Sequence, residues 1–589
     1  MKRFSCLFAI PVIVAALAFP SEASAQAVTI EYTLSARNPL SHLYGIQIEI
    51  NGLRSTSVEL SMPAWSPGVY SIRDFAGNVQ QFEAATKQNQ PLRFVQTDKQ
   101  TWRITKSSGD DLVVRYRVYS TTFTDELADV TPASVFMYVA GQTQRPISVR
   151  YEIPNEWRTE TALEKQGDRY VAADYETLVT SPAFLGRLKI IELDNQSIPF
   201  RIVVSNPRTQ MTDLQLEADL TDIAGAAAAM FGTVPFRSYT FLVRVQPTSG
   251  ASAVAYPNSA RLTAGENDFV AQNSYNGFLY AAAQALTKAW YYRAARPRSM
   301  TPYDLTREAY SRNLWFTEGV AAYTADLLLL RSKILTPPEY FQKVSVEIDA
   351  FQHQPGRFVR SLEDASFNAW TRSDNSVNAT ISYVLKGKIA GLLLDAEIRS
   401  RSSGAKGVED VLRHLLSTAQ SRPSGLDDPA LEVAIQSATG LQVGEFFERV
   451  VRGKVDIDYR SYMEKIGVAV VIQKTPASVV LGIEFERIEG NLARIRRVLP
   501  DSPGEAAKLD LGDVVLAMDS ERISFDNIVG RIHSKPLGRP VAVTVMRGER
   551  LLSLTITPAL TQNEIWSLGE APATTAEQLR LRNAWKGMN

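Results

Sequence analysis

The period of the hydrophobic pattern changes along the chain, and this change constrains the fold more than any other feature. In the first 200 residues, apolar and polar residues alternate in runs such as 28–32, 45–50 and 113–119. A period of two is typical of strands that bury one face, and turn signals such as Asn51-Gly52 separate the runs. The pattern predicts an N-terminal β-sandwich of antiparallel strands over residues 26–200.

Helical periodicity replaces this alternation between residues 201 and 460. The longest predicted helices cover residues 274–292, 313–333 and 383–399. Residues 466–560 return to short strands around a brief helix, and the tail 561–589 contains one helical stretch. We therefore expect a multidomain α+β protein with a β-rich start, a mostly helical middle and a small C-terminal domain before the tail.

The first 25 residues have the pattern of an export signal. Lys2 and Arg3 precede an apolar run at 4–19, and Ala23-Ser24-Ala25 forms a small-residue cleavage site. The apolar run is shorter than the ~20 residues that span a bilayer. We expect cleavage after Ala25 and a bacterial protein in the periplasm or the medium, without a membrane anchor. The sequence does not indicate an oligomeric state.

Composition excludes several functions. The 63 Lys and Arg residues equal the 63 Asp and Glu residues in number, so we expect no nucleic-acid partner, which would favour a basic surplus. The only cysteine, Cys6, lies in the export signal, which removes thiol chemistry from the mature chain. The histidines are His42, His353, His414 and His533. Their spacing matches no zinc motif.

Four segments occur in the order found in one enzyme family. They are Met62–Phe75 (MPAWSPGVYSIRDF), Lys99–Arg103 (KQTWR), Leu314–Gly319 (LWFTEG) and Ile381–Gly387 (ISYVLKG). Together they resemble the glycyl aminopeptidases, metallopeptidase family sixty-one. The resemblance covers nearly the whole mature chain. It implies a β-rich first domain, a thermolysin-like catalytic domain and a C-terminal PDZ domain.

The resemblance also implies a zinc site, from which this sequence departs. Such enzymes carry HExxH on a helix, where the two histidines bind zinc and the glutamate acts as general base. Counted back from Trp290, these three positions hold Gln284, Ala285 and Lys288. The position of the third ligand keeps Glu318. A lysine repels a dication and one carboxylate does not hold catalytic zinc, so we expect no zinc and no other cofactor.

Two further positions follow from the resemblance. The family has an edge strand whose glutamate receives the amino group of the peptide, followed by a histidine; here these positions fall on Ala255 and Tyr256. An unpaired ammonium group in such a cleft costs several kcal/mol. Tyr383 stands where the family has a tyrosine that stabilises an oxyanion. The alternative is that Tyr383 only packs the predicted helix 383–399.

The third unit resembles a PDZ domain. Its carboxylate-binding loop is predicted at Leu481, Gly482, Ile483, Glu484 and Phe485. Backbone N–H groups of such a loop accept a peptide carboxylate while the peptide adds a strand to the sheet. A peptide or protein C-terminus is therefore the expected partner, and packing within the chain is the alternative.

The sequence favours an exported pseudopeptidase that has lost zinc-dependent catalysis and binds peptides or proteins through its cleft and PDZ domain. One alternative is an active aminopeptidase with altered site chemistry, based on Glu318 and Tyr383. A second alternative is a structural partner of an active paralogue.

Overall fold

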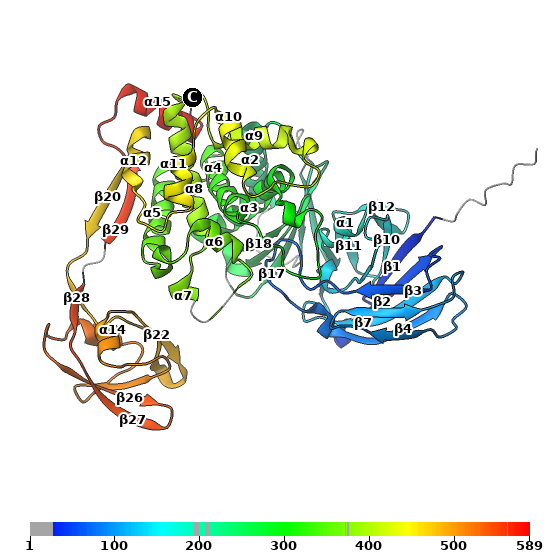
Figure 1. The fold of residues 1–589 in the computed structure, drawn as a ribbon, viewed down its shortest axis with the longest axis horizontal. Coiled ribbons are helices and arrows are strands. Elements are labelled where there is room, and N and C mark those ends of the chain that lie inside the picture. Colours follow the sequence, from blue (N-terminus) through cyan, green and yellow to red (C-terminus); the bar gives the residue numbers. More distant parts are fainter. Residues whose placement is uncertain are drawn as a thin grey trace, which may run out of the picture. The chain divides into compact units, whose positions relative to one another are not determined.

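The computed structural model describes residues 27–193, 199–205, 213–248, 250–371, 373, 376–561 and 564–588. The chain forms two compact units (Figure 1). The first unit contains residues 1–311 and 415–428, and the second contains 312–414 and 429–589. The division falls inside the range 201–460 that the sequence predicted as one domain. None of the described helices is long and apolar enough to cross a membrane.

The N-terminal part of the first unit is a β-sandwich, as the alternating pattern predicts. One sheet has the order β12 (Glu164–Gln166), β13 (Arg169–Ala172), β10 (Ile147–Glu152), β1 (Thr29–Ser35), β2 (Leu43–Asn51), β7 (Leu112–Tyr119) and β4 (Val79–Thr86). A second sheet has the order β5 (Arg93–Gln96), β6 (Thr101–Thr105), β3 (Ser57–Ser61) and β9 (Tyr138–Val139). The inner faces meet where Phe82 stacks on Trp102, with ring centroids 5.3 Å apart.

One strand pair differs from the predicted antiparallel arrangement. β1 and β10 are parallel, with Ile30 opposite Ile147. The chain between them contains most of the sandwich, which is more than enough for the long crossover that a parallel pair requires. A third sheet has the order β11 (Arg158–Thr161), β14 (Ala183–Gly186) and β8 (Leu127–Val130), and the helix α1 (Tyr175–Val179) precedes β14 in the chain.

The remainder of the first unit is a five-stranded sheet with two long helices. Its order is β15 (Lys189–Leu193), β16 (Phe200–Val204), β17 (Tyr239–Gln246), β19 (Ser259–Gly265) and β18 (Ser252–Ala255), with helices α2 (Asp213–Phe231) and α3 (Gln272–Ala295). β16, β17 and β19 are parallel and largely buried, and the mostly apolar sequences of β16 and β17 are typical of such strands. β18 is antiparallel to β19 and forms an edge of this sheet.

Helices dominate the second unit outside the PDZ domain and its flanking strands. They are α4 (Ala321–Arg331), α5 (Pro337–Gln352), α6 (Leu362–Phe367), α7 (Ser376–Ala379), α8 (Tyr383–Arg401), α9 (Val408–Ser417, whose last three residues belong to the first unit), α10 (Ala430–Thr439), α11 (Gly444–Phe446), α12 (Tyr459–Met463) and α15 (Ala576–Lys586). The helix predicted at 313–333 begins with a π-helical turn, η6 (Trp315–Val320), and continues as α4.

The PDZ domain of the second unit has a sheet in the order β22 (Ile483–Ile488), β23 (Leu492–Val498), β24 (Val514–Met518), β26 (Val541–Arg547) and β27 (Arg550–Ile556), with β25 (Glu521–Arg522) paired to β24. Two short helices, α13 (Pro503–Ala506) and α14 (Ile528–His533), accompany it, where the sequence predicted one. Its apolar core includes Ile495, Val515 and Val543. β22 lies at an edge of the sheet.

Two strand pairs lie on either side of the PDZ domain in sequence. β20 (Val468–Lys474) pairs with β29 (Glu564–Glu570), and β21 (Ser478–Val480) pairs with β28 (Ala559–Thr561), both antiparallel. The sequence placed β20 in the PDZ range 466–560 and β29 in the tail. Their pairing shows that both belong to one ribbon, which leads the chain into the PDZ domain and out again (Figure 1).

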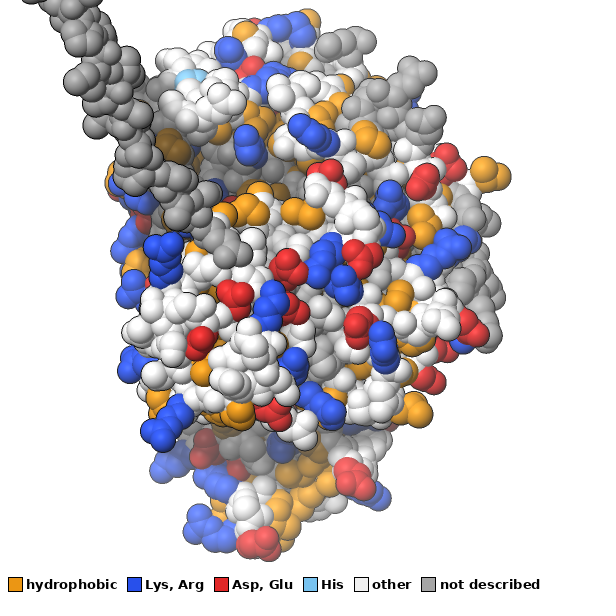
Figure 2. Space-filling view, turned by 90° about the vertical axis from the view of Figure 1, so that its right-hand side faces the viewer, with side chains coloured by type: hydrophobic (Ala, Val, Ile, Leu, Met, Phe, Trp, Pro, Cys, Tyr) orange, Lys and Arg blue, Asp and Glu red, His pale blue; other side chains and the backbone are white. Residues whose placement is uncertain are grey.

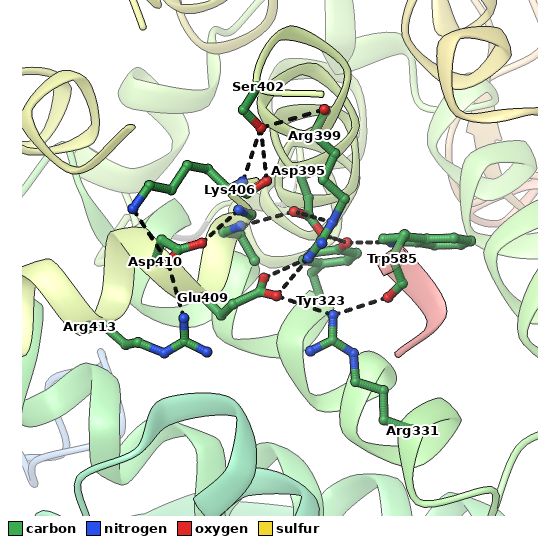
Figure 3. A network of polar contacts seen from close by, with 12 residues as sticks. Tyr323, Arg331, Asp395, Arg399, Ser402, Lys406, Glu409, Asp410, Arg413 and Trp585 are labelled. Carbon is green, nitrogen blue, oxygen red and sulfur yellow. Dashed lines mark hydrogen bonds and ion pairs between the residues drawn. The ribbon is translucent and has the colours of Figure 1, made fainter. Parts of the chain in front are cut away.

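The C-terminal helix α15 is fixed to the helical part by a buried polar network (Figure 3). The indole N–H of Trp585 donates to Tyr323 Oη at 2.9 Å, and Tyr323 donates to Asp395 Oδ2 at 2.6 Å. Arg399 pairs with Asp395 at 3.0 Å and with Glu409 at 2.7 Å. Burial alone would raise the pKa of Glu409, but the neighbouring guanidinium groups hold it well below its usual range.

The surface mixes charges of both signs. Figure 2 shows one face of the protein, on which Lys and Arg side chains are interspersed with Asp and Glu side chains. Neither sign dominates this face, in keeping with the balanced composition.

Candidate active-site region and PDZ groove

Helix α3 of the first unit carries three of the predicted site positions. Gln284 and Lys288 are four residues apart, so they share one face of the helix, and both are half-buried. Ala285 is only 1% exposed. Tyr239 Oη donates to the carbonyl oxygen of Ala285 at 3.1 Å, which anchors α3 to strand β17. The three positions present an amide, an ammonium group and a methyl group.

The edge strand β18 packs against α3 and ends at Ala255. Ala255 lies opposite Ala260 of β19, and Tyr256 follows it as a buried side chain whose burial raises its phenol pKa. Arg261 on β19 forms an ion pair with the buried carboxylate of Asp129 at 3.3 Å. The two positions where the family has a glutamate and a histidine therefore contribute a small apolar and a buried aromatic side chain.

A tight turn from the distinctive segment 62–75 lies against this edge strand. Val69 N donates to Ser66 O at 3.1 Å, and Gly68 has φ +84° in the left-handed region. Pro followed by Gly at the two central positions is the signature of a type II turn. A Cβ on Gly68 would lie 2.8 Å from Val254 Cγ1, so only glycine allows this approach to β18.

Trp65, next to this turn, explains why the segment is so distinctive. Its indole N–H donates to the carbonyl oxygens of Asp304 at 3.0 Å and Arg307 at 2.9 Å. Its ring is fully buried. The segment thus ties the β-sandwich to the loop after α3 and holds the turn on the edge strand.

Glu318 and Tyr383 lie in the second unit, where two helices cross at glycines. Glu318 precedes Gly319 in the π-helical turn, and Tyr383 begins α8, four residues before Gly387. A Cβ on Gly319 would lie 2.6 Å from Gly387 Cα and 2.9 Å from Val384 O. The glycines therefore allow close contact of the backbone segments that carry Glu318 and Tyr383, and both of these side chains are half-buried. π-helical turns inside helices are frequent at functional sites.

Sequence reasoning missed Lys386, which lies inside the segment ISYVLKG. Its side chain is 1% exposed, and Nζ donates to Gly453 O at 3.2 Å. Burial lowers its pKa to about 8. Lys388, two residues further, is also buried, but it pairs with Asp326 and with Glu347 at 2.6 Å. No local signal distinguishes Lys386, because the same helix also carries charged residues such as Lys388 and Asp395.

Replacing Lys386 by methionine is expected to stabilise the second unit by about 2 kcal/mol at pH 7, because the buried charge is removed at the loss of one hydrogen bond. The folded-state pKa of about 8 lies below that of an unfolded lysine, so between these two values the unfolded state binds more protons. The stability of the wild type should therefore rise with pH above 8, and that of Lys386→Met should not.

Thermal unfolding of both proteins from pH 7 to pH 10 measures this difference. Lys388→Met is the matched control: it leaves the carboxylates of Asp326 and Glu347 without their buried partner and should destabilise the protein. A Lys386→Met protein that is less stable than the wild type at pH 7 would show that burial of this ammonium group carries no penalty.

The PDZ loop has a fixed backbone. Gly504 N donates to Leu481 O at 2.8 Å, and Leu499 N donates to Gly482 O at 2.9 Å. Gly482 has φ +68°, and a Cβ there would lie 2.2 Å from Ser502 Cβ.

The side chains of the loop have different surroundings. Ile483 and Phe485 pack against the PDZ core, while Glu484 pairs with Arg496 at 3.0 Å and also with Arg497. The loop leads directly into the edge strand β22, a geometry that can accept an added strand.

Known proteins resemble this chain in sequence and in fold. The Peptidase M61 N-terminal domain matches residues 31–187, the M61 glycyl aminopeptidase domain matches residues 278–390, and a PDZ domain matches residues 479–557. A comparison with curated protein sequences gave no match.

Among solved structures, the fold is similar to that of an aminopeptidase N family protein from Idiomarina loihiensis, with 23% identity and a TM-score of 0.86 over 95% of this chain and 100% of that one. An M1 zinc metallopeptidase from Deinococcus radiodurans aligns with 14% identity and a TM-score of 0.44 over 73% of this chain and 96% of that one.

A β-rich domain, a helical part and a PDZ domain follow one another in a multidomain α+β chain. The matches to the Peptidase M61 N-terminal domain, to the M61 glycyl aminopeptidase domain and to a PDZ domain confirm the resemblance inferred from the sequence.

Proposed function

We propose that the protein is an exported pseudopeptidase that has lost zinc-dependent catalysis and binds peptides or proteins through its cleft and its PDZ domain. The observation that carries this proposal is the set of side chains on helix α3 at the positions of the family's zinc motif. The half-buried face of α3 presents Gln284 and Lys288 where the family has two zinc-binding histidines, and Ala285 replaces the general base. The proposed location is the periplasm or the medium.

The chemistry of these side chains does not fit zinc. A carboxamide is a weak ligand for this metal, an ammonium group repels it, and a methyl group takes no proton from water. Among the described residues, no group of three or more His, Cys, Asp and Glu side chains is arranged to hold a metal ion. No zinc-dependent step is therefore derived for this chain.

The PDZ loop and the edge strand β22 support the part of the proposal that concerns peptide binding. The loop at Leu481 and Gly482 is held by hydrogen bonds of its carbonyl groups, and β22 is an edge strand. A peptide C-terminus can add to this edge while its carboxylate meets backbone N–H groups of the loop. A ligand with a free carboxylate is therefore the proposed class of partner.

One observation favours a second candidate function. The crossing at Gly319 and Gly387 brings together the backbone segments that carry Glu318 and Tyr383, two half-buried residues that an aminopeptidase with altered site chemistry would use. Loss of the general base and of two metal ligands removes the activated water, which is worth orders of magnitude in rate. The third possibility, a structural partner of an active paralogue, predicts copurification with that paralogue and no peptide ligand.

The zinc content of the purified mature protein tests the proposal directly. We expect less than about a tenth of an equivalent, unchanged in Glu318→Ala, because the ligand positions on α3 do not fit the metal. Hydrolysis of aminoacyl peptides should be equal in the two proteins and at background level. About one equivalent of zinc that is lost in Glu318→Ala, together with hydrolysis, would establish the second candidate instead.

A further inference from the structure

Arg497 connects two parts of the second unit. It lies on β23 opposite Glu484, which belongs to both the PDZ loop and β22, and the two side chains form an ion pair. The Arg497 side chain is only 14% exposed and that of Glu484 is 34% exposed, so the guanidinium group is the more buried partner of this pair. Its guanidinium group also reaches out of the PDZ domain: Nη1 donates to Asn378 Oδ1 at 3.4 Å.

Asn378 belongs to the segment that leads into Tyr383. It lies in α7, and four residues later Ser382 begins α8 by accepting a hydrogen bond from Leu385 N at 3.1 Å. Tyr383 is the first residue of that helix. The position of Asn378 therefore bears on the start of α8, where one of the surviving family residues lies.

The same segment is confined on another side. Gly356, in the short helix Pro355–Phe358, packs so closely on Thr380 that a Cβ would lie 2.0 Å from its carbonyl oxygen. Close-packed backbone of this kind has no room to absorb a shift of Asn378 locally. A displacement at Asn378 is therefore passed along the chain toward Ser382.

We propose that Arg497 is a positioning residue that couples peptide binding at the PDZ loop and β22 to the segment carrying Tyr383. The inference rests on the proposed peptide binding and adds its regulation. A peptide that pairs with the free edge of β22 fixes this strand and with it Glu484. Because one guanidinium group serves both Glu484 and Asn378, ordering the strand also orders the segment between α7 and α8.

Coupling between two sites is reciprocal, which allows a test from outside the PDZ domain. The probe is a pool of heptapeptides with randomised last three residues and free carboxylates, and the amidated pool measures background. In the full-length mature protein, Asn378→Ala should weaken binding of the pool about threefold to tenfold, the effect of one hydrogen bond. Bound peptide should slow amide exchange over residues 376–388 in the wild type and not in Asn378→Ala.

Arg487→Ala is the matched control. Arg487 lies on β22, as Glu484 does, but the ion pair of Arg487 with Asp526 stays within the PDZ domain. This variant should keep the exchange response at 376–388. Equal peptide affinity in the wild type and Asn378→Ala, with no exchange response, would overturn the coupling alone. A wild type that does not retain the free-carboxylate pool would overturn the proposed peptide binding and the coupling with it.

Discussion

The double variant Gln284→His/Lys288→His should bind about one equivalent of zinc, at least tenfold more than the wild type. Both side chains lie on one half-buried face of α3 at the i, i+4 spacing that zinc-binding histidines use. The substitutions remove the repelling ammonium group and add two imidazole ligands, one in place of the Gln284 side chain and one in place of the Lys288 side chain. Metal content after dialysis against zinc measures the gain.

Two controls show which residues hold the metal. Gln284→His alone leaves Lys288 in place and should stay near the level of the wild type. The resemblance assigns the third ligand to Glu318, so Glu318→Ala in the double variant should lower the retained zinc. Peptide hydrolysis should stay at background, because Ala285 still replaces the base. A double variant that binds no zinc would show that these positions do not correspond to the family's histidines.

Trp585→Ala should destabilise the second unit by about 3–5 kcal/mol, the usual cost of removing a buried tryptophan side chain. Trp585 is fully buried, and its ring lies 5.3 Å from that of Tyr340 and 5.9 Å from that of Phe341. The substitution also removes the donor to Tyr323 Oη inside the buried network (Figure 3). Urea unfolding measures the loss, and limited proteolysis should then cut near α15.

Leu579→Ala provides the comparison on the same helix. Leu579 is 43% exposed, so its replacement should change the free energy of unfolding by no more than about 0.5 kcal/mol. If the two variants were equally stable, α15 would not be packed in solution as the buried network indicates.

The local period of apolar residues was sufficient to predict the strands of the first domain and the long helices. The alternation in 45–50 and 113–119 predicted β2 and β7, because a half-buried strand shows its period in its own sequence. The parallel pairing of β1 with β10 and the ribbon of β20 with β29 could not be predicted this way. Strand pairing over long separations depends on packing, which no local period encodes.

The candidate site could be located only through the resemblance. Gln284, Ala285 and Lys288 have the pattern of an ordinary helix. They are candidate site residues only because they occupy the positions of the family's HExxH motif. The turn at Gly68 was visible as Ser-Pro-Gly, but its contact with Val254 joins distant segments. The burial of Lys386 was missed because α8 carries several charged residues, and each of their side chains points inward or outward according to its neighbours in space.

The strand pair around the PDZ domain makes that domain an insert in a hairpin. Lys474, the last residue of β20, lies opposite Glu564, the first residue of β29, so the chain leaves the helical part and returns to it at neighbouring points. A two-residue Asn-Gly turn has the geometry to join such ends. In evolutionary terms, the PDZ domain can therefore be exchanged or lost as one unit. The strand β29 and the helix α15, which follow it in sequence, would remain packed on the helical part.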